Sequence, residues 1–118
     1  MKKLFRSFSF AWQGIRHCFL HEQNFKIHIV AALVTIVIAQ LLHCSAGEWI
    51  AILLSVALVI SMEMINTAIE RICDMQQNDF HPQIKIIKDV AAGAVLICAI
   101  SAAVCGAIIF IPKIIQLF

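Results

Sequence analysis

The sequence predicts an all-α integral membrane protein with an N-terminal amphipathic surface helix and three transmembrane helices. Hydrophobic residues make up 62% of the 118 residues and charged residues only 14%, which is far more apolar than a soluble domain. The apolar residues gather in three long runs, and the last of them, from Val90 to Ile111, is uncharged and long enough to cross a bilayer. A chain of this length is expected to form one domain, residues 1–118.

Residues 1–24 are predicted to form the surface helix. Apolar residues recur there every three or four positions and make one stripe, which comprises Phe5, Phe8, Trp12, Ile15 and Phe19. Basic and polar residues take the other side, and such a helix lies in the membrane interface with its cations toward anionic headgroups. A soluble helix that binds a partner is the alternative. Phe10 lies among the basic residues, where its ring would be free to stack on a nucleotide base.

The three spans are predicted at residues 27–43, 47–73 and 86–112. The second opens with Trp49 as an interface anchor, and the third follows Pro82, which suits the first turn of a helix. Small residues repeat every four positions in the third span and permit close approach of helices; they are Ala99, Ala103 and Ala107, and also Ala102 and Gly106. Because three short helices bury little against one another, a homo-oligomer is expected.

Basic residues indicate how the spans are oriented. They precede the first span and flank the second loop, whereas the turn at 43–48 has none. This set comprises Lys2, Lys3, Arg6, Arg16, Lys26, Arg71, Lys85 and Lys88. The positive-inside rule therefore predicts that the N-terminus and the second loop lie in the cytoplasm, where ATP is available.

A stripe of polar residues ends the second apolar run. If this run is helical, its four members fall within about 80° of one another; they are Glu63, Asn66, Glu70 and Asp74. Carboxylates at the end of a span are costly and indicate a site for cations, protons or metal-bound phosphate. A helix end that emerges into water is the plain alternative, but Glu63 lies roughly 16 Å along the axis from Asp74 and still among apolar residues.

Phosphoryl transfer would use the groups that this topology gathers at the cytoplasmic level. The reaction needs a divalent ion on the phosphates, cations that offset developing charge, and a carboxylate that accepts the proton of the attacking hydroxyl. The candidates are the carboxylates Glu22, Glu63, Glu70 and Asp74, the cations Lys3, Arg6, Lys85 and Lys88, and the amide of Asn66. The sequence has no Gly-rich phosphate loop and no kinase catalytic-loop motif, which excludes a soluble kinase fold.

Two other function classes would also use intramembrane carboxylates or a small helical bundle. A proton-coupled transporter needs a central carboxylate and a paired arrangement of spans, whereas here the charges cluster at one end. In a membrane assembly protein without enzymatic activity, the same carboxylates would only mark a helix end. Consumption of ATP that depends on a lipid alcohol separates these classes from a lipid kinase.

Several motifs resemble the prokaryotic diacylglycerol kinase family. They are Glu-x-x-Asn-x-Ala-Ile-Glu at 63–70 followed by Asp74, Lys88-Asp89-x-Ala-Ala-Gly-Ala-Val-Leu at 88–96, Trp12-x-Gly14-x-Arg16, and Glu22. The resemblance covers nearly the whole chain. It implies a homotrimer of three-span subunits in the bacterial cytoplasmic membrane. Such an enzyme uses ATP and Mg²⁺ to phosphorylate a lipid alcohol and has no nucleic-acid partner.

The resemblance also implies roles for individual residues. Glu63 matches the general base for the lipid hydroxyl, and Asn66 matches a polar residue of the active site. Glu22 and Glu70 match the carboxylates that bind the metal, and Asp74 supports them. Positions that contact ATP are matched by Lys3, Phe10, Glu22, Glu70, Asp79, Phe80, His81, Lys88 and Asp89. The lipid substrate would lie against Trp12, Arg16 and Glu63.

Three features favour the Gram-positive branch, whose members phosphorylate undecaprenol. Asn24, His28 and the Ile-Pro-Lys-Ile segment at 111–114 resemble that branch. The Gram-negative diacylglycerol kinases have an acidic residue in place of His28 and a tyrosine in place of Phe10. Undecaprenol is therefore the expected substrate, and diacylglycerol is the alternative.

Overall fold

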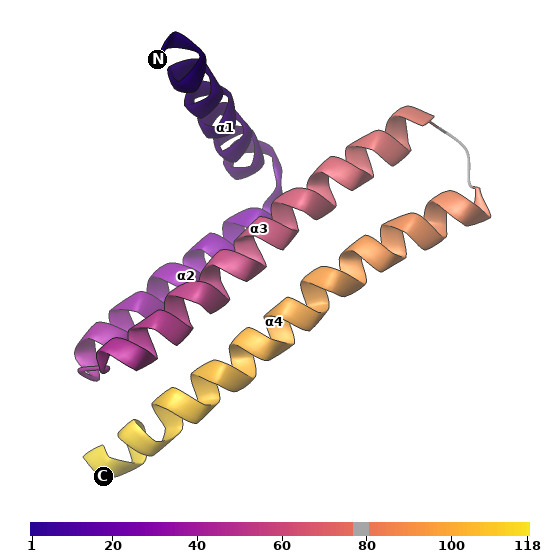
Figure 1. Cartoon of the computed structure of the whole chain (residues 1–118). Coiled ribbons are helices and arrows are strands. Elements are labelled where there is room, and N and C mark those ends of the chain that lie inside the picture. Colours follow the sequence, from indigo (N-terminus) through magenta and orange to yellow (C-terminus); the bar gives the residue numbers. More distant parts are fainter. Residues whose placement is uncertain (77–80) are drawn as a thin grey trace.

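The computed structural model describes residues 1–76 and 81–118, and it is helical through almost all of them. The helices are α1 (Lys2–His21), α2 (Gln23–Leu41), α3 (Ala46–Gln76) and α4 (Pro82–Leu117). Figure 1 shows α2, α3 and α4 running alongside one another in alternating directions, while α1 points away from them. The prediction of an all-α chain is confirmed.

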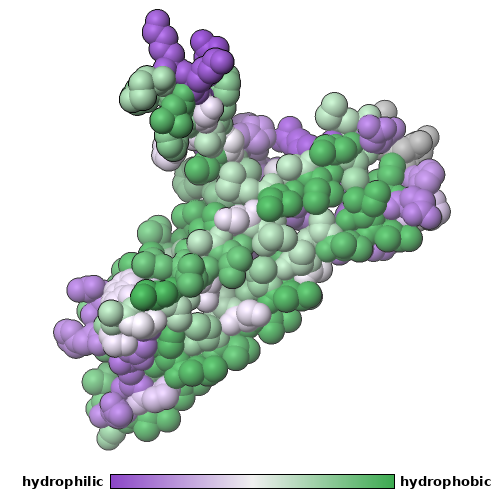
Figure 2. Space-filling view, viewed as in Figure 1, coloured by the Kyte–Doolittle hydropathy of each residue, from purple (hydrophilic) through white to green (hydrophobic). Residues whose placement is uncertain are grey.

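The three long helices have the properties of membrane spans. Each of α2, α3 and α4 is long and apolar enough to cross a bilayer. In Figure 2 hydrophobic residues cover the visible length of the bundle, and hydrophilic residues gather at its two ends and at the tip of α1. An apolar surface bounded by two polar ends fits a bilayer, so the chain is a multi-pass membrane protein.

A single residue separates α1 from α2. Glu22 has extended backbone angles, ends α1 and starts α2. The break falls where the sequence changes from one apolar stripe to an apolar run on all sides. The stripe on α1 is exposed, and its members are Phe5, Phe8, Trp12, Ile15 and Phe19. In contrast, Phe25 on α2 is fully buried just beyond the joint.

The turn between α2 and α3 closes one end of the bundle. His43 has a positive φ of 53°, and the amides of His43 and Cys44 bond back to the carbonyls of Gln40 and Ala39. This is the Schellman arrangement that ends a helix, here with histidine at the left-handed position that glycine normally takes. The chain therefore reverses direction within a few residues, which sets α2 against α3.

At the start of α3, Ser45 and Glu48 each cap the backbone amide of the other. The amide of Glu48 donates to Ser45 Oγ at 3.2 Å, and the amide of Ser45 donates to Glu48 Oε1 at 2.8 Å, which is a capping box. The same Glu48 Oε1 lies 3.1 Å from the Nζ of Lys113 on α4. Lys113 is not among the basic residues used above to orient the spans. At this end of the bundle its charge is paired with that of Glu48.

Packing between α3 and α4 leaves a groove beside α2. At one end of the bundle Ala39, Ile52 and Ile109 form a buried core. Further along, the small residues that were predicted to permit close approach line a groove of about 540 Å³; they are Ala99, Ala102, Ala103, Gly106 and Ala107. His28 on α2 lines the same groove.

The base of α1 is tied to α3 by a polar contact. Arg71 Nη2 lies 2.8 Å from His17 Nε2. Because the guanidinium has only donors, Nε2 of His17 must be the unprotonated acceptor. The ring of His17 also stacks on that of His21, with centroids 4.4 Å apart, and Cys18 is buried beside them. His17 thus attaches α1 to α3, and His21 supports its ring.

Replacing Arg71 with alanine is expected to loosen α1 from the bundle, because the substitution removes the donor to His17, which is worth about 1 kcal/mol. The measurement is the mobility of a spin label at the exposed position Gln13 in lipid nanodiscs. We expect faster motion in Arg71→Ala and no change in Lys85→Ala, which breaks only an exposed pair on α4. Unchanged mobility in Arg71→Ala would show that this contact does not hold α1.

Candidate active site

The polar stripe predicted for the second span lies on one continuous helix, α3. Its members change from buried to exposed along the helix: Glu63 is 5% exposed and Asn66 7%, Glu70 is half-buried, and Asp74 is exposed at the end. A helix that merely emerged into water would expose its carboxylates. Glu63 is instead buried, which is costly for a charged carboxylate and makes its neighbours decisive.

The nearest such neighbour of Glu63 is His28 on α2. The distance from His28 Nε2 to Glu63 Oε2 is 3.7 Å, which is an ion-pair separation rather than a hydrogen bond. The carboxylates of Glu70 and Glu22 also act on Glu63 through their charge. The one direct polar contact of Glu63 in the described chain is thus with α2, and the charges of α3 and of the joint between α1 and α2 act on it from a distance.

Asn66 and Glu70 form the next pair along the stripe. Asn66 Nδ2 donates to Glu70 Oε1 at 3.2 Å, which orients the amide. Asn66 Oδ1 is buried and has no hydrogen-bond partner among the described residues. An unsatisfied buried carbonyl oxygen costs about 1–3 kcal/mol, so this atom is available to a ligand that donates or coordinates.

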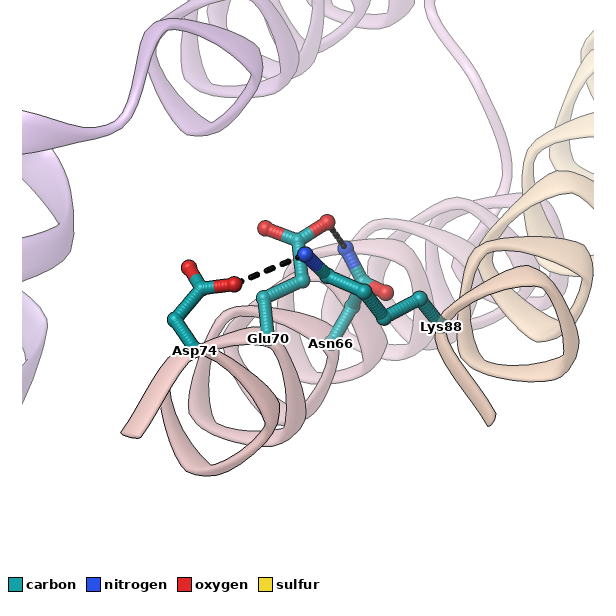
Figure 3. A network of polar contacts seen from close by, with 4 residues as sticks. All are labelled: Asn66, Glu70, Asp74 and Lys88. Atoms are coloured by element: carbon teal, nitrogen blue, oxygen red, sulfur yellow. Dashed lines mark hydrogen bonds and ion pairs between the residues drawn. The ribbon is translucent and has the colours of Figure 1, made fainter. Parts of the chain in front are cut away.

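Lys88 is the residue of α4 that contacts the polar stripe. Its Nζ lies 2.8 Å from Asp74 Oδ1, and Figure 3 shows the side chain reaching from α4 toward the face of α3 that carries Asn66, Glu70 and Asp74. The charge of Glu70 also acts on this ammonium group. Lys88 is therefore a cation paired with a carboxylate of the stripe at the polar end of the bundle.

Glu22 reaches the same region from the base of α1. Burial raises the pKa of the Cys18 thiol above its usual value, the negative charge of Glu22 raises it further, and the positive charge of Arg71 lowers it. His17, the residue before Cys18, contacts Arg71, the residue after Glu70, so the base of α1 borders the polar stripe.

Other residues expected in the site lie apart from this group. On the exposed surface of α1 are Lys3, Phe10, Trp12 and Arg16, and in the part of the chain that the structure describes no hydrogen bond or ion pair joins them to the stripe. Asp89 pairs with Lys85 on α4, and His81 caps α4 by accepting from the amide of Gln83. The expected positions Asp79 and Phe80 lie outside the described residues.

The contact of His28 with Glu63 was not predicted from the sequence. There His28 served only as an indication of which lipid is the substrate. The sequence did contain a signal for a functional role of His28, because an ionisable residue inside an apolar helix indicates function by default. The partner could not be named, since the contact depends on how α2 is rotated against α3. The contact between Arg71 and His17 was missed for the same reason.

The chemistry of the donors fits Mg²⁺. Glu70 and Asn66 Oδ1 offer hard oxygen atoms on successive turns of α3, and Glu22, at the joint between α1 and α2, offers a further carboxylate. Mg²⁺ is usually bound through one or two carboxylates together with substrate phosphates rather than by an all-protein cage. Residues 1–76 and 81–118 contain no group of three His, Cys, Asp or Glu side chains that could hold a metal ion.

Comparison with known proteins gives similarity over nearly the whole chain. The family described as prokaryotic diacylglycerol kinase matches residues 9–110. The undecaprenol kinase of Bacillus subtilis is 37% identical over 113 residues, which cover 96% of this chain and 92% of that protein. The diacylglycerol kinase of Escherichia coli K12 is 31% identical over 102 residues, covering 86% of this chain and 84% of the relative.

A third relative is longer than this chain. The diacylglycerol kinase of Synechocystis is 38% identical over 112 residues. The match covers 94% of this chain but only 64% of that protein, so the chain spans less than two thirds of it. The similarity to the Bacillus and Escherichia proteins, in contrast, extends over most of both partners.

Proposed function

The chain belongs to the prokaryotic diacylglycerol kinase family, and we propose that it transfers the γ-phosphate of ATP to the lipid alcohol undecaprenol at the membrane interface. The observation that carries this proposal is the buried carboxylate of Glu63, which lies at the polar end of a span beside His28, Glu70 and Glu22. A lipid hydroxyl at the interface would meet this carboxylate without leaving the bilayer.

The choice of undecaprenol rests on the Bacillus undecaprenol kinase, which aligns along almost its whole length, and on Asn24 and His28. Diacylglycerol is the second candidate, since the Synechocystis and Escherichia relatives are named diacylglycerol kinases. The catalytic roles proposed for the residues are the same for either lipid.

In this proposal Glu63 accepts the proton of the lipid hydroxyl. The carboxylate is nearly excluded from water and has one close polar partner, His28, so it lies at a defined place where the hydroxyl can approach it. Removing the proton makes the lipid oxygen a better nucleophile toward the γ-phosphorus. The phosphoryl group then passes directly from ATP to the lipid.

The polar residues beyond Glu63 would hold the nucleotide. Glu22 and Glu70, with the free carbonyl oxygen of Asn66, would bind Mg²⁺, which supplies charge neutralisation on the phosphates. Lys88, on the facing helix, offsets the negative charge that develops during transfer. Asp74 positions Lys88 by pairing with it.

The proposal also covers the placement and assembly of the chain. The exposed apolar stripe of α1 would lie in the interface, and the basic residues near the N-terminus and the second loop would face the cytoplasm. The bundle leaves large apolar side chains and a groove uncovered, which supports association of copies into a homotrimer. Lys3, Phe10, Trp12 and Arg16 would then approach ATP or lipid from α1.

The lipid preference is tested with purified protein in mixed micelles that contain Mg²⁺ and ATP. Undecaprenol and diacylglycerol are offered separately at equal mole fraction, and the phosphorylated lipid is quantified. We expect a strong preference for undecaprenol. Preference for diacylglycerol would overturn the substrate assignment alone, whereas activity on neither lipid would refute the kinase assignment for these substrates.

Replacing Glu63 with glutamine is expected to lower kcat roughly 100-fold or more, because the amide keeps the shape but accepts no proton. Binding of Mg·ATP, measured by fluorescence of a nucleotide analogue, should stay close to that of the unmodified protein. Glu48→Gln, which changes a carboxylate at the opposite end of α3, is the control. A Glu63→Gln protein with near-normal kcat would remove this residue from the mechanism.

Replacing Glu70 with alanine acts on a different step. The substitution removes a carboxylate expected to bind the metal and the partner of the Asn66 amide, so the Mg²⁺ concentration for half-maximal rate should rise roughly tenfold. Rates are measured across a Mg²⁺ titration at fixed ATP, with Glu48→Gln again as control. An unchanged Mg²⁺ dependence would show that Glu70 is not a ligand.

A further inference from the structure

His28 occupies a junction between two parts of the molecule. Its side chain lines the groove of about 540 Å³ between α2, α3 and α4, and its Nε2 faces the carboxylate of Glu63. The side chain is 24% exposed, whereas that of Glu63 is only 6% exposed. The imidazole therefore meets both the apolar groove and the buried carboxylate.

Glu63 has few means of fixing its orientation. Among the described residues no hydrogen bond to its side chain is found, and the ion pair with His28 is its only close polar contact. The other charged groups that act on it are the carboxylates of Glu22 and Glu70, which repel it. From α1, Cys18 is the titratable group on which the charge of Glu63 acts.

We propose that His28 is a positioning residue that orients the Glu63 carboxylate by donating its Nε2 proton. The inference rests on the proposed function, in which Glu63 accepts the proton of the lipid hydroxyl. The 3.7 Å separation is longer than a hydrogen bond, but contacts of this kind in unliganded sites tighten when substrate binds. Since α2 carries the imidazole and α3 the carboxylate, their packing sets the position of the base.

The chemistry of amide side chains supplies a sharp test. The amide nitrogen of glutamine lies close to the position of Nε2 in histidine, whereas that of asparagine lies close to Nδ1. His28→Gln therefore keeps a donor toward Glu63, and His28→Asn withdraws it. Thr35→Val is the matched control, because Thr35 lines the same groove two turns further along α2 and its hydroxyl bonds only to its own helix.

Steady-state kinetics with the lipid alcohol varied at saturating Mg·ATP give the first readout. We expect His28→Asn to lower kcat roughly 10-fold to 100-fold, with the KM for lipid within about twofold of normal. His28→Gln should recover most of kcat, and Thr35→Val should match the unmodified protein. A normal kcat in His28→Asn, a higher lipid KM alone, or a His28→Gln protein as slow as His28→Asn would each overturn the proposal.

A second readout does not require turnover. The infrared carboxylate band of Glu63, identified by its loss in Glu63→Gln, reports the hydrogen bonding of that group. It should shift in His28→Asn and return in His28→Gln. An identical band in all three proteins would contradict the positioning role even if no lipid were phosphorylated, so failure of this inference is distinct from failure of the kinase assignment.

Discussion

Burying a carboxylate in a membrane helix is costly, and the chemistry around Glu63 depends on which neighbours offset that cost and which add to it. The neighbours that bring charge to it come from α2, from α3 itself and from the residue that joins α1 to α2. Since one of these groups is cationic when protonated and two are anionic, the site combines attraction with repulsion. Such a balance is costly for stability and suits a group that must exchange a proton.

The remaining polar contacts extend from this centre toward the helix ends. Asn66 and Glu70 continue the stripe, and the pair of Asp74 and Lys88 joins α3 to α4. At the opposite end of the bundle the only comparable contacts in the described chain are the capping box and the pair of Glu48 and Lys113, which are structural. The two ends are thus chemically different, and only one gathers carboxylates, a buried amide and a free acceptor.

The fold could be predicted from the sequence because the length of each apolar run and the spacing of its polar residues are local properties. The alignment of Glu63, Asn66, Glu70 and Asp74 follows from helical periodicity alone. In contrast, the contacts of His28 with Glu63 and of Arg71 with His17 depend on the rotation of one helix against another, which no local pattern determines. The α1 residues expected at the nucleotide and lipid stay predictions, because they make no contact with the stripe in one copy of the chain.

The central claim is that Glu63 accepts a proton while the phosphoryl group passes directly from ATP to the lipid. The most direct test uses ATP made chiral at its γ-phosphorus with oxygen isotopes and determines the configuration of the phosphorylated lipid. Direct in-line transfer predicts inversion at phosphorus. Retention would mean two successive transfers through a covalent phospho-enzyme and would contradict the direct transfer in which Glu63 serves as base.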